Sequence, residues 1–278
     1  MKITVKELSA ADLETFYRKA QRTRSPNTVI KFHANIRESL QWGIRRGYVL
    51  TNVADVAEKP KKEPFLPHFY NLDKMKKLLD EVWGTQLEFA VVMACHYGLR
   101  REEIVGLKWD AIDFQYKQIE IKHIVTEAVV DGHYQQISLD RAKTEKSLRT
   151  LPLLPSVEDL LLRMKTQRED LEWIYGARYD HSFDGYIYLW PNGKRVKPTW
   201  VTHAFHRFLK ETDPDNLIRF HDLRHSCATL MRHEGVPMED IQRWLGHSSI
   251  VTTESVYAHF DDGQNRISAA KLASALLE

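Results

Sequence analysis

The chain has very little cysteine and no long apolar segment. Only Cys95 and Cys227 occur among its 278 residues. They could form at most one disulfide, and their spacing indicates no metal site. No apolar run approaches the roughly 20 residues that a transmembrane helix needs, and the first residues lack a secretory signal pattern. These absences predict two buried thiols in a reducing compartment, and a cytoplasmic protein with no membrane partner.

Two common signatures of phosphate chemistry are also missing. Gly193-Lys194 could end a P-loop, but the position five residues before Gly193 is Tyr188 and not the required glycine. No cluster of aspartates and glutamates stands out as a two-metal nuclease site. The sequence therefore gives no sign of a P-loop nucleotide site or of a two-metal site.

The net charge of +2 is small but unevenly distributed. Residues 1–63 hold 13 Lys/Arg against 7 Asp/Glu, whereas the remainder holds 27 against 31. Within 21–48, six basic residues face a single acid, Glu38. A basic helical stretch suits contacts to nucleic-acid phosphates, although charge runs more often form a solvated face. The candidate DNA-binding residues in this stretch are Arg22, Arg24, Lys31, Arg45 and Arg46.

Helix and linker signals divide the chain into two parts. Helices are predicted over 10–22 and from the Ser25-Pro26 cap to Gly47. The segment 58–67, EKPKKEPFLP, is charged and rich in proline, as linkers are. We therefore expect residues 1–57 to form a helical unit and residues 68–278 a second domain. Two helices bury little core, so the first unit is predicted to be truncated at its N-terminus.

The second part is predicted to be mostly helical with a small antiparallel sheet, an α+β fold. Alternating residues in 118–125 and 133–139 favour a hairpin around Asp131-Gly132, and 147–154 and YIYLW (186–190) favour further strands. A capping box at Ser156 would open one helix. Other helices are predicted over 72–83, 86–98, 199–211, 221–234, 237–245 and 251–258.

The segment HDLRHSCATLMRHEG, 221–235, allows two chemical interpretations. His221 and His225 share a helix face, as in the zinc motif H-E-x-x-H, but Asp222 replaces the glutamate and no clear third ligand follows. His221 and Arg224 also share a face, and a guanidinium beside an imidazole suits a phosphate. The structural alternative is an amphipathic helix with histidine and arginine on its surface.

Three other segments place reactive side chains at helix or strand ends. YGLRREEIVGLKWDAID, 97–113, puts Arg100 just after a helix stop at Gly98; RAKTEKSLRTLPL, 141–153, puts Lys143 between two strand candidates. WLGHSSIVTTESVYAHF, 244–260, carries His247 after Leu-Gly and Tyr257 ten residues later. Taken singly, the first two segments are also compatible with a helix N-terminus and a polar hairpin.

Taken together, these segments resemble the tyrosine recombinases, the family of phage and conjugative-transposon integrases. The resemblance covers nearly the whole chain from about residue 20. It implies a partial helical core-binding domain followed by a catalytic domain. The front of the chain departs from the family pattern, because a further core-binding helix and an arm-binding domain are not recognisable there. The implied catalytic residues are Arg100, Lys143, His221, Arg224, His247 and the nucleophile Tyr257.

This resemblance implies site-specific DNA recombination through a 3′-phosphotyrosyl intermediate. Tyr257 would attack the scissile phosphate, with His221 as its general base and Lys143 as the acid for the leaving 5′-oxygen. The two arginines and His247 would bind the phosphate oxygens. The protein–DNA bond keeps the phosphodiester energy, and the cationic side chains can do the electrostatic work of a metal. We therefore expect neither a nucleotide nor a metal cofactor.

The expected partners are double-stranded DNA carrying core recombination sites and further copies of this chain, from dimer to tetramer. The tail 265–278 carries an apolar stripe of Ala269, Leu272, Ala273 and Leu276. It would either dock on its own domain or be exchanged with a neighbouring protomer. DNA-bending or directionality factors are further candidate partners. Three alternatives remain open: a type IB topoisomerase, a zinc hydrolase built on His221 and His225, and a DNA-binding regulator without chemistry.

Overall fold

The computed structural model describes residues 3–63, 68–140 and 148–246. Lys143, His247, Tyr257, the helix expected over 251–258 and the tail 265–278 lie outside these ranges. The chain divides into two compact units, 1–66 and 67–278. None of the helices in the described part combines the length and apolar character that a bilayer span requires. Cys95 and Cys227 are both free and buried, as predicted.

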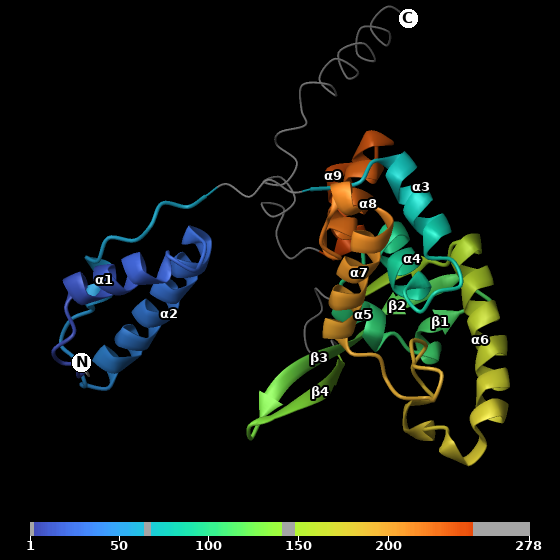
Figure 1. Ribbon diagram of the computed structural model, residues 1–278, viewed down its shortest axis with the longest axis horizontal. Coiled ribbons are helices and arrows are strands. Elements are labelled where there is room, and N and C mark those ends of the chain that lie inside the picture. Colours follow the sequence, from blue (N-terminus) through green and yellow to red (C-terminus); the bar gives the residue numbers. More distant parts are fainter. Residues whose placement is uncertain (1–2, 64–67, 141–147, 247–278) are drawn as a thin grey trace, which may run out of the picture. The chain divides into compact units, whose positions relative to one another are not determined.

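The first unit is built from two helices and one short turn, drawn in blue in Figure 1. Helix α1 spans Ala10–Ala20, α2 spans Pro26–Arg45, and a 3₁₀ turn spans Val53–Asp55. The predicted Ser25 cap and first-turn proline are confirmed, because the Ser25 side chain accepts from the backbone N–H of Thr28. The small core of this unit contains Leu13, Tyr17, Val29, Leu40, Ala54 and Ala57.

The second unit is arranged around helix α4, Glu88–Tyr97. Its sequence EFAVVMACHY is apolar on almost every side, so nearly all of the helix is buried. Figure 1 shows α6 on one side of α4 and α7 and α8 on the other. The remaining helices are α3 (Leu72–Glu81), α5 (Arg101–Gly106), α6 (Pro155–Tyr175), α7 (Pro198–Thr212), α8 (Asp222–His233) and α9 (Met238–Leu245).

The strands form two small antiparallel sheets in the described part of this unit. Strands β1 (Ile112–Asp113), β2 (Gln118–Ile121) and β5 (Arg149–Pro152) pair in the order β1-β2-β5. Strands β3 (His123–Val130) and β4 (His133–Asp140) form a hairpin. Its turn residues Asp131 and Gly132 both have positive φ, 50° and 80°, as a two-residue hairpin turn requires. The predicted α+β fold and hairpin turn are confirmed.

Three predicted elements need correction. Residues 118–125 do not form one strand, because the chain leaves the three-stranded sheet at Lys122 and then starts the hairpin. Ser156 does not cap α6, because Pro155 already occupies the first helical position after Leu154. YIYLW is not a strand: its pairing with other strand-like segments is limited, in the described ranges, to the isolated bridges Lys108–Tyr186 and Leu189–Arg195.

Candidate active site

The site begins at a tight turn between α4 and α5. Gly98 ends α4 with φ +60°. A Cβ at this position would lie 2.3 Å from the Leu245 side chain and 3.5 Å from Cγ of Arg224. Only glycine therefore lets the turn pack against the end of α9. Arg100 follows at the first position before α5, and its side chain is 28% exposed.

Arg100 is held by a carboxylate one turn further along α5. The backbone N–H of Arg100 donates to Oε2 of Glu103 (2.9 Å), and its Nη1 donates to Oε1 (3.1 Å). Glu103 is completely buried. Burial alone would raise the pKa of this carboxyl, but the charges of Arg149 and Arg100 overcome that effect and hold its pKa at about 2. Glu103 is therefore ionised and fixes the direction of Arg100.

Arg224 reaches the same turn from helix α8. Its Nη1 donates to the backbone oxygen of Gly98 (2.5 Å), and its Nη2 donates to that of Leu245 (2.7 Å). The residue is 2% exposed. Burial, followed by the nearby charge of Arg100, lowers the pKa of the Arg224 guanidinium to about 9. It therefore remains a cation at neutral pH, and it links the ends of α4, α8 and α9.

His221 precedes α8 and lies beside these arginines. The residue is exposed, but its ring contacts that of His225, with 5.4 Å between ring centroids and nearly perpendicular planes. Partial desolvation lowers the pKa of His221 to about 4, with further lowering by His225, Arg224 and Arg100. The imidazole is therefore neutral at pH 7 and can accept a proton.

The zinc interpretation of this helix has little support from the donors present. The buried carboxylate of Asp222 accepts from the backbone N–H of Arg219 (2.8 Å) and from its Nε (3.0 Å) and Nη2 (2.6 Å). In the described ranges, no other His, Cys, Asp or Glu joins His221 and His225 in a group close enough to hold an ion. Asp222 instead stabilises the turn that begins α8.

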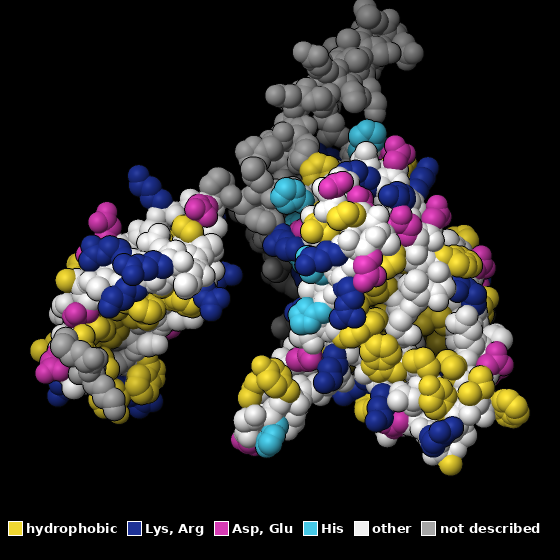
Figure 2. Space-filling view, viewed as in Figure 1, with side chains coloured by type: hydrophobic (Ala, Val, Ile, Leu, Met, Phe, Trp, Pro, Cys, Tyr) yellow, Lys and Arg dark blue, Asp and Glu magenta, His cyan; other side chains and the backbone are white. Residues whose placement is uncertain are grey.

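The described residues thus bring two arginines and a histidine together from separate helices. Arg100 Nη2 lies 3.5 Å from the backbone oxygen of Gly246, the residue directly before His247 in the sequence. Figure 2 shows histidine and Lys/Arg side chains gathered along the edge of this unit that carries α7 and α8. The exposed histidines and basic residues of α7 are His203, His206, Arg207 and Lys210. Two guanidinium groups beside a neutral imidazole can bind a phosphate and accept a proton next to it.

The candidate DNA-binding residues all lie in the first unit and are exposed: Arg22, Arg24, Lys31, Arg45 and Arg46. Arg45 makes a 3.3 Å ion pair with Glu38, and Arg46 stacks 5.6 Å from the ring centroid of Trp42. Both contacts are at the surface and hold their partners weakly.

One residue at this site escaped the sequence analysis. Arg149 opens β5, and its Nη1 and Nη2 donate to Oε1 (3.3 Å) and Oε2 (3.0 Å) of Glu103. Strand periodicity could have found it, because Arg149 falls on the same face as the buried Leu151. A charged residue on a buried strand face indicates a buried partner.

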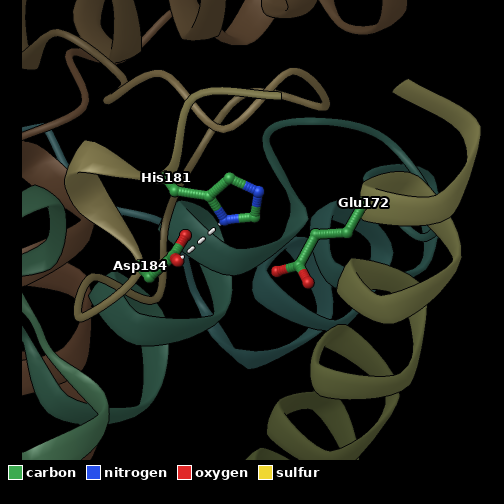
Figure 3. A group of neighbouring side chains, drawn as sticks. All are labelled: Glu172, His181 and Asp184. Atoms are coloured by element: carbon green, nitrogen blue, oxygen red, sulfur yellow. Dashed lines mark hydrogen bonds and ion pairs between the residues drawn. The ribbon is translucent and has the colours of Figure 1, made fainter. Parts of the chain in front are cut away.

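A second group of ionisable side chains lies at the far end of α6, as Figure 3 shows. Potential ligand atoms of Glu172, His181 and Asp184 lie within 4.8 Å of one another. His181 and Asp184 are exposed, and their side chains are already hydrogen-bonded to each other at 3.0 Å. In the described ranges the group does not contact the arginines of the candidate site, and a solvated hydrogen-bonded pair explains it.

The comparisons with known proteins identify one family. The sequence model of the phage integrase family matches residues 70–264. A tyrosine recombinase XerC-like protein of Caldanaerobacter subterraneus is 24% identical over 272 residues, 93% of this chain and 68% of that protein. The ICEBs1 integrase of Bacillus subtilis is 30% identical over 210 residues, 75% of this chain and 55% of that integrase. The chain therefore spans about half to two thirds of these relatives.

Among solved structures, the Tn1549 transposon integrase in complex with transposon right end DNA has the same fold. The TM-score is 0.77 at 20% identity, with 98% of this chain and 88% of that chain covered.

Proposed function

Since the chain belongs to the phage integrase family of tyrosine recombinases, we propose that it is a site-specific DNA recombinase, acting through a covalent protein–DNA intermediate. The observation that carries this proposal is the convergence of Arg100, His221 and Arg224 around the turns at Gly98 and Gly246. The direct test is to trap the protein on nicked duplex DNA and to ask whether a covalent adduct survives denaturation.

The proposed cleavage step is a transesterification. The phenol oxygen of Tyr257 forms a bond to phosphorus as the bond to the 5′-oxygen breaks. His221 takes the phenol proton, Lys143 gives a proton to the leaving 5′-oxygen, and His247 donates to the phosphate. Attack by the 5′-hydroxyl of a partner strand reverses these steps and releases Tyr257. No net phosphodiester bond is lost, so no external energy source is required.

Arg100 and Arg224 would stabilise the negative charge that builds on the phosphate in the transition state. Because the Arg224 guanidinium is 2% exposed, it can bind a phosphate only where that phosphate is also withdrawn from water. Such a site strengthens electrostatic contacts. The two guanidinium groups would supply the positive charge that the proposed cleavage step needs.

The proposed partners are duplex DNA with core recombination sites and other copies of this chain. Strand exchange joins two duplexes, which requires at least two cleaving protomers. The tail 265–278 is the segment we propose to be exchanged between protomers, since its apolar stripe needs a partner surface. Exchange would couple the position of Tyr257 to assembly and restrain an isolated protomer from cutting.

His221 should become protonated at a pH well below the usual pKa of a histidine. Its pKa of about 4 in the folded protein lies below the unperturbed value near 6.5. The unfolded state therefore takes up a proton first as pH falls from about 6.5 to about 4. We expect the free energy of unfolding to decrease over that window, and His221→Gln to remove this part of the decrease. NMR titration of the His221 ring should give a midpoint below 6, and a midpoint at 6.5 or above would contradict the site's electrostatics.

DNA affinity should depend on the exposed arginines at the end of α2. The double variant Arg45→Ala/Arg46→Ala should bind duplex DNA more weakly. It should also flatten the plot of log K against log salt, by up to ~0.9 for each lost phosphate contact. Fluorescence anisotropy with a labelled duplex at several salt concentrations measures both quantities.

The matched control for this test is Lys76→Ala/Lys77→Ala on α3, which removes the same charge from exposed positions of the second unit. If both double variants change affinity and slope equally, overall charge explains the effect. Arg45 and Arg46 would then have no specific role in binding.

A further inference from the structure

Glu103 is shared between two arginines that come from different parts of the chain. Its Oε1 accepts from Nη1 of Arg100 (3.1 Å), at the start of α5, and from Nη1 of Arg149 (3.3 Å), on β5; its Oε2 accepts from Nη2 of Arg149 (3.0 Å). The Glu103 side chain is 0% exposed and that of Arg149 is 7% exposed. Two guanidinium groups and one carboxylate together carry one net positive charge. Arg100 and Glu103 without Arg149 would form a neutral pair.

Arg149 also lies against the turn that ends α9. Gly246 has φ +66°, and a Cβ built there would lie 2.7 Å from Nη1 of Arg149. Arg224 donates to the backbone oxygen of Leu245 in the same turn, and Arg100 donates to that of Gly246. All three arginines therefore contact the short segment that leads into His247.

Stability is a poor explanation for this arrangement. A buried ion pair loses about as much free energy in desolvation as it gains in attraction. In addition, Nε of Arg149 is buried with no hydrogen-bond partner in the described ranges, which costs further free energy. What a buried, two-pronged ion pair does supply is a fixed direction for the groups that it joins.

We propose that Arg149 is a positioning residue for DNA cleavage. By sharing Glu103 it leaves Arg100 with enough positive charge to bind the scissile phosphate, and it supports the Gly246 turn from which His247 follows. This inference rests on the proposed function. Without Arg149, the buried carboxylate of Glu103 would lose its two-pronged partner, and its charge would draw more strongly on the donors of Arg100 in competition with the phosphate.

The molecule contains a matched control. On the far side of the same unit, Arg163 Nη1 donates to Oε2 of Glu88 (3.1 Å), and Nη2 pairs with Oε1. This ion pair is also two-pronged and its carboxylate is buried. Within the described residues, this pair makes no hydrogen bond or ion pair with Arg100, His221 or Arg224. Arg163→Gln should therefore change stability without changing the cleavage rate.

The test compares covalent-adduct formation by Arg149→Gln, Arg149→Lys, Arg149→Gln/Glu103→Gln and Arg163→Gln. The substrate is a pool of nicked duplexes with randomised arms, and DNA affinity and thermal midpoint are measured in parallel. We expect Arg149→Gln to slow adduct formation about tenfold or more, the size seen when residues that orient active groups are removed. DNA affinity should stay within about threefold. Arg149→Lys should recover part of the rate, because it restores the charge without the fork.

The double variant distinguishes a role of Arg149 in positioning Arg100 from a purely structural role in packing. Removing the Glu103 charge frees Arg100, so Arg149→Gln/Glu103→Gln should cleave faster than Arg149→Gln alone. A purely structural role predicts that the double variant is slower. The inference is overturned if Arg149→Gln cleaves at the wild-type rate, if its loss only equals that of Arg163→Gln, or if the second substitution gives no recovery. If Arg149→Gln does not fold, the cleavage rate of Arg149→Lys is compared with the rates of wild type and Arg163→Gln instead. A rate equal to either one overturns the inference. Failure of wild-type protein to form any adduct overturns the proposed function itself, and this inference with it.

Discussion

Tyr257→Phe is expected to bind duplex DNA as tightly as the wild-type protein and to form no covalent adduct. The substitution removes only the phenol oxygen, which is the atom that bonds to phosphorus in the proposed mechanism. Attack by water in its place would cut the DNA without attaching it to the protein. Gel-shift titration measures binding, and a denaturing gel of a labelled nicked duplex measures attachment.

Tyr116→Phe is the matched control, since Tyr116 is 70% exposed and lies outside the candidate site. It should form adduct at the wild-type rate. Continued covalent attachment of Tyr257→Phe would show that another residue is the nucleophile. Loss of attachment in both variants would point to a general effect of removing a phenol.

Arg224→Lys is expected to lose cleavage by about 10²- to 10³-fold, the size of effect seen when one preorganised transition-state donor is removed. An ammonium cannot reproduce the fork that donates to both Gly98 and Leu245. The two turns would lose their common support at the same time as the phosphate loses a cation. Single-turnover adduct formation, at a temperature where circular dichroism shows the variant folded, measures the loss.

The control for Arg224 is Arg219→Lys, five residues earlier, where the side chain is 59% exposed and pairs with Asp222. That variant tests whether loss of any arginine near the start of α8 slows cleavage. Near-wild-type rates for folded Arg224→Lys would remove Arg224 from the catalytic group. A loss in Arg219→Lys as large as that in Arg224→Lys would indicate damage to α8 in place of lost phosphate contacts.

The sequence predicts most helices and the hairpin because their signals are local. Helix starts, helix ends and tight turns depend on the backbone preferences of a few residues, here Ser25-Pro26, Gly98 and Asp131-Gly132. The structure has the helix start, the helix end and the hairpin turn at these positions, as predicted. The change of sheet at Lys122 has no local signal, because the alternation of residues continues across it. The prediction of a Ser156 cap is wrong because Pro155 already occupies the first position of α6, so that Ser156 lies inside the helix.

In the candidate site, too, the features with a local sequence signal could be predicted and those that depend on the fold could not. Arg100, His221 and Arg224 could be predicted because their motifs carry the residue types that bind a phosphate. The role of Arg149 depends on the distance between β5 and α5 in the fold, which no spacing in the sequence encodes. The lowered pKa of His221 likewise follows first from desolvation in the folded protein, and then from His225 and Arg224 on the same helix and Arg100 on another segment. The sequence motifs therefore identify candidate residues, whereas tertiary contacts determine their partners and their pKa values.

We propose, above all, that this chain cuts DNA by attaching Tyr257 to the 3′ side of the break. The most direct measurement incubates wild-type protein with nicked duplexes that lose the leaving strand, then digests the covalent product and maps the modified peptide by mass spectrometry. We expect a peptide containing Tyr257 that carries a 3′-phosphonucleotide. A modification on any other residue, attachment to a 5′-phosphate, or cleaved DNA with no attached protein would contradict it.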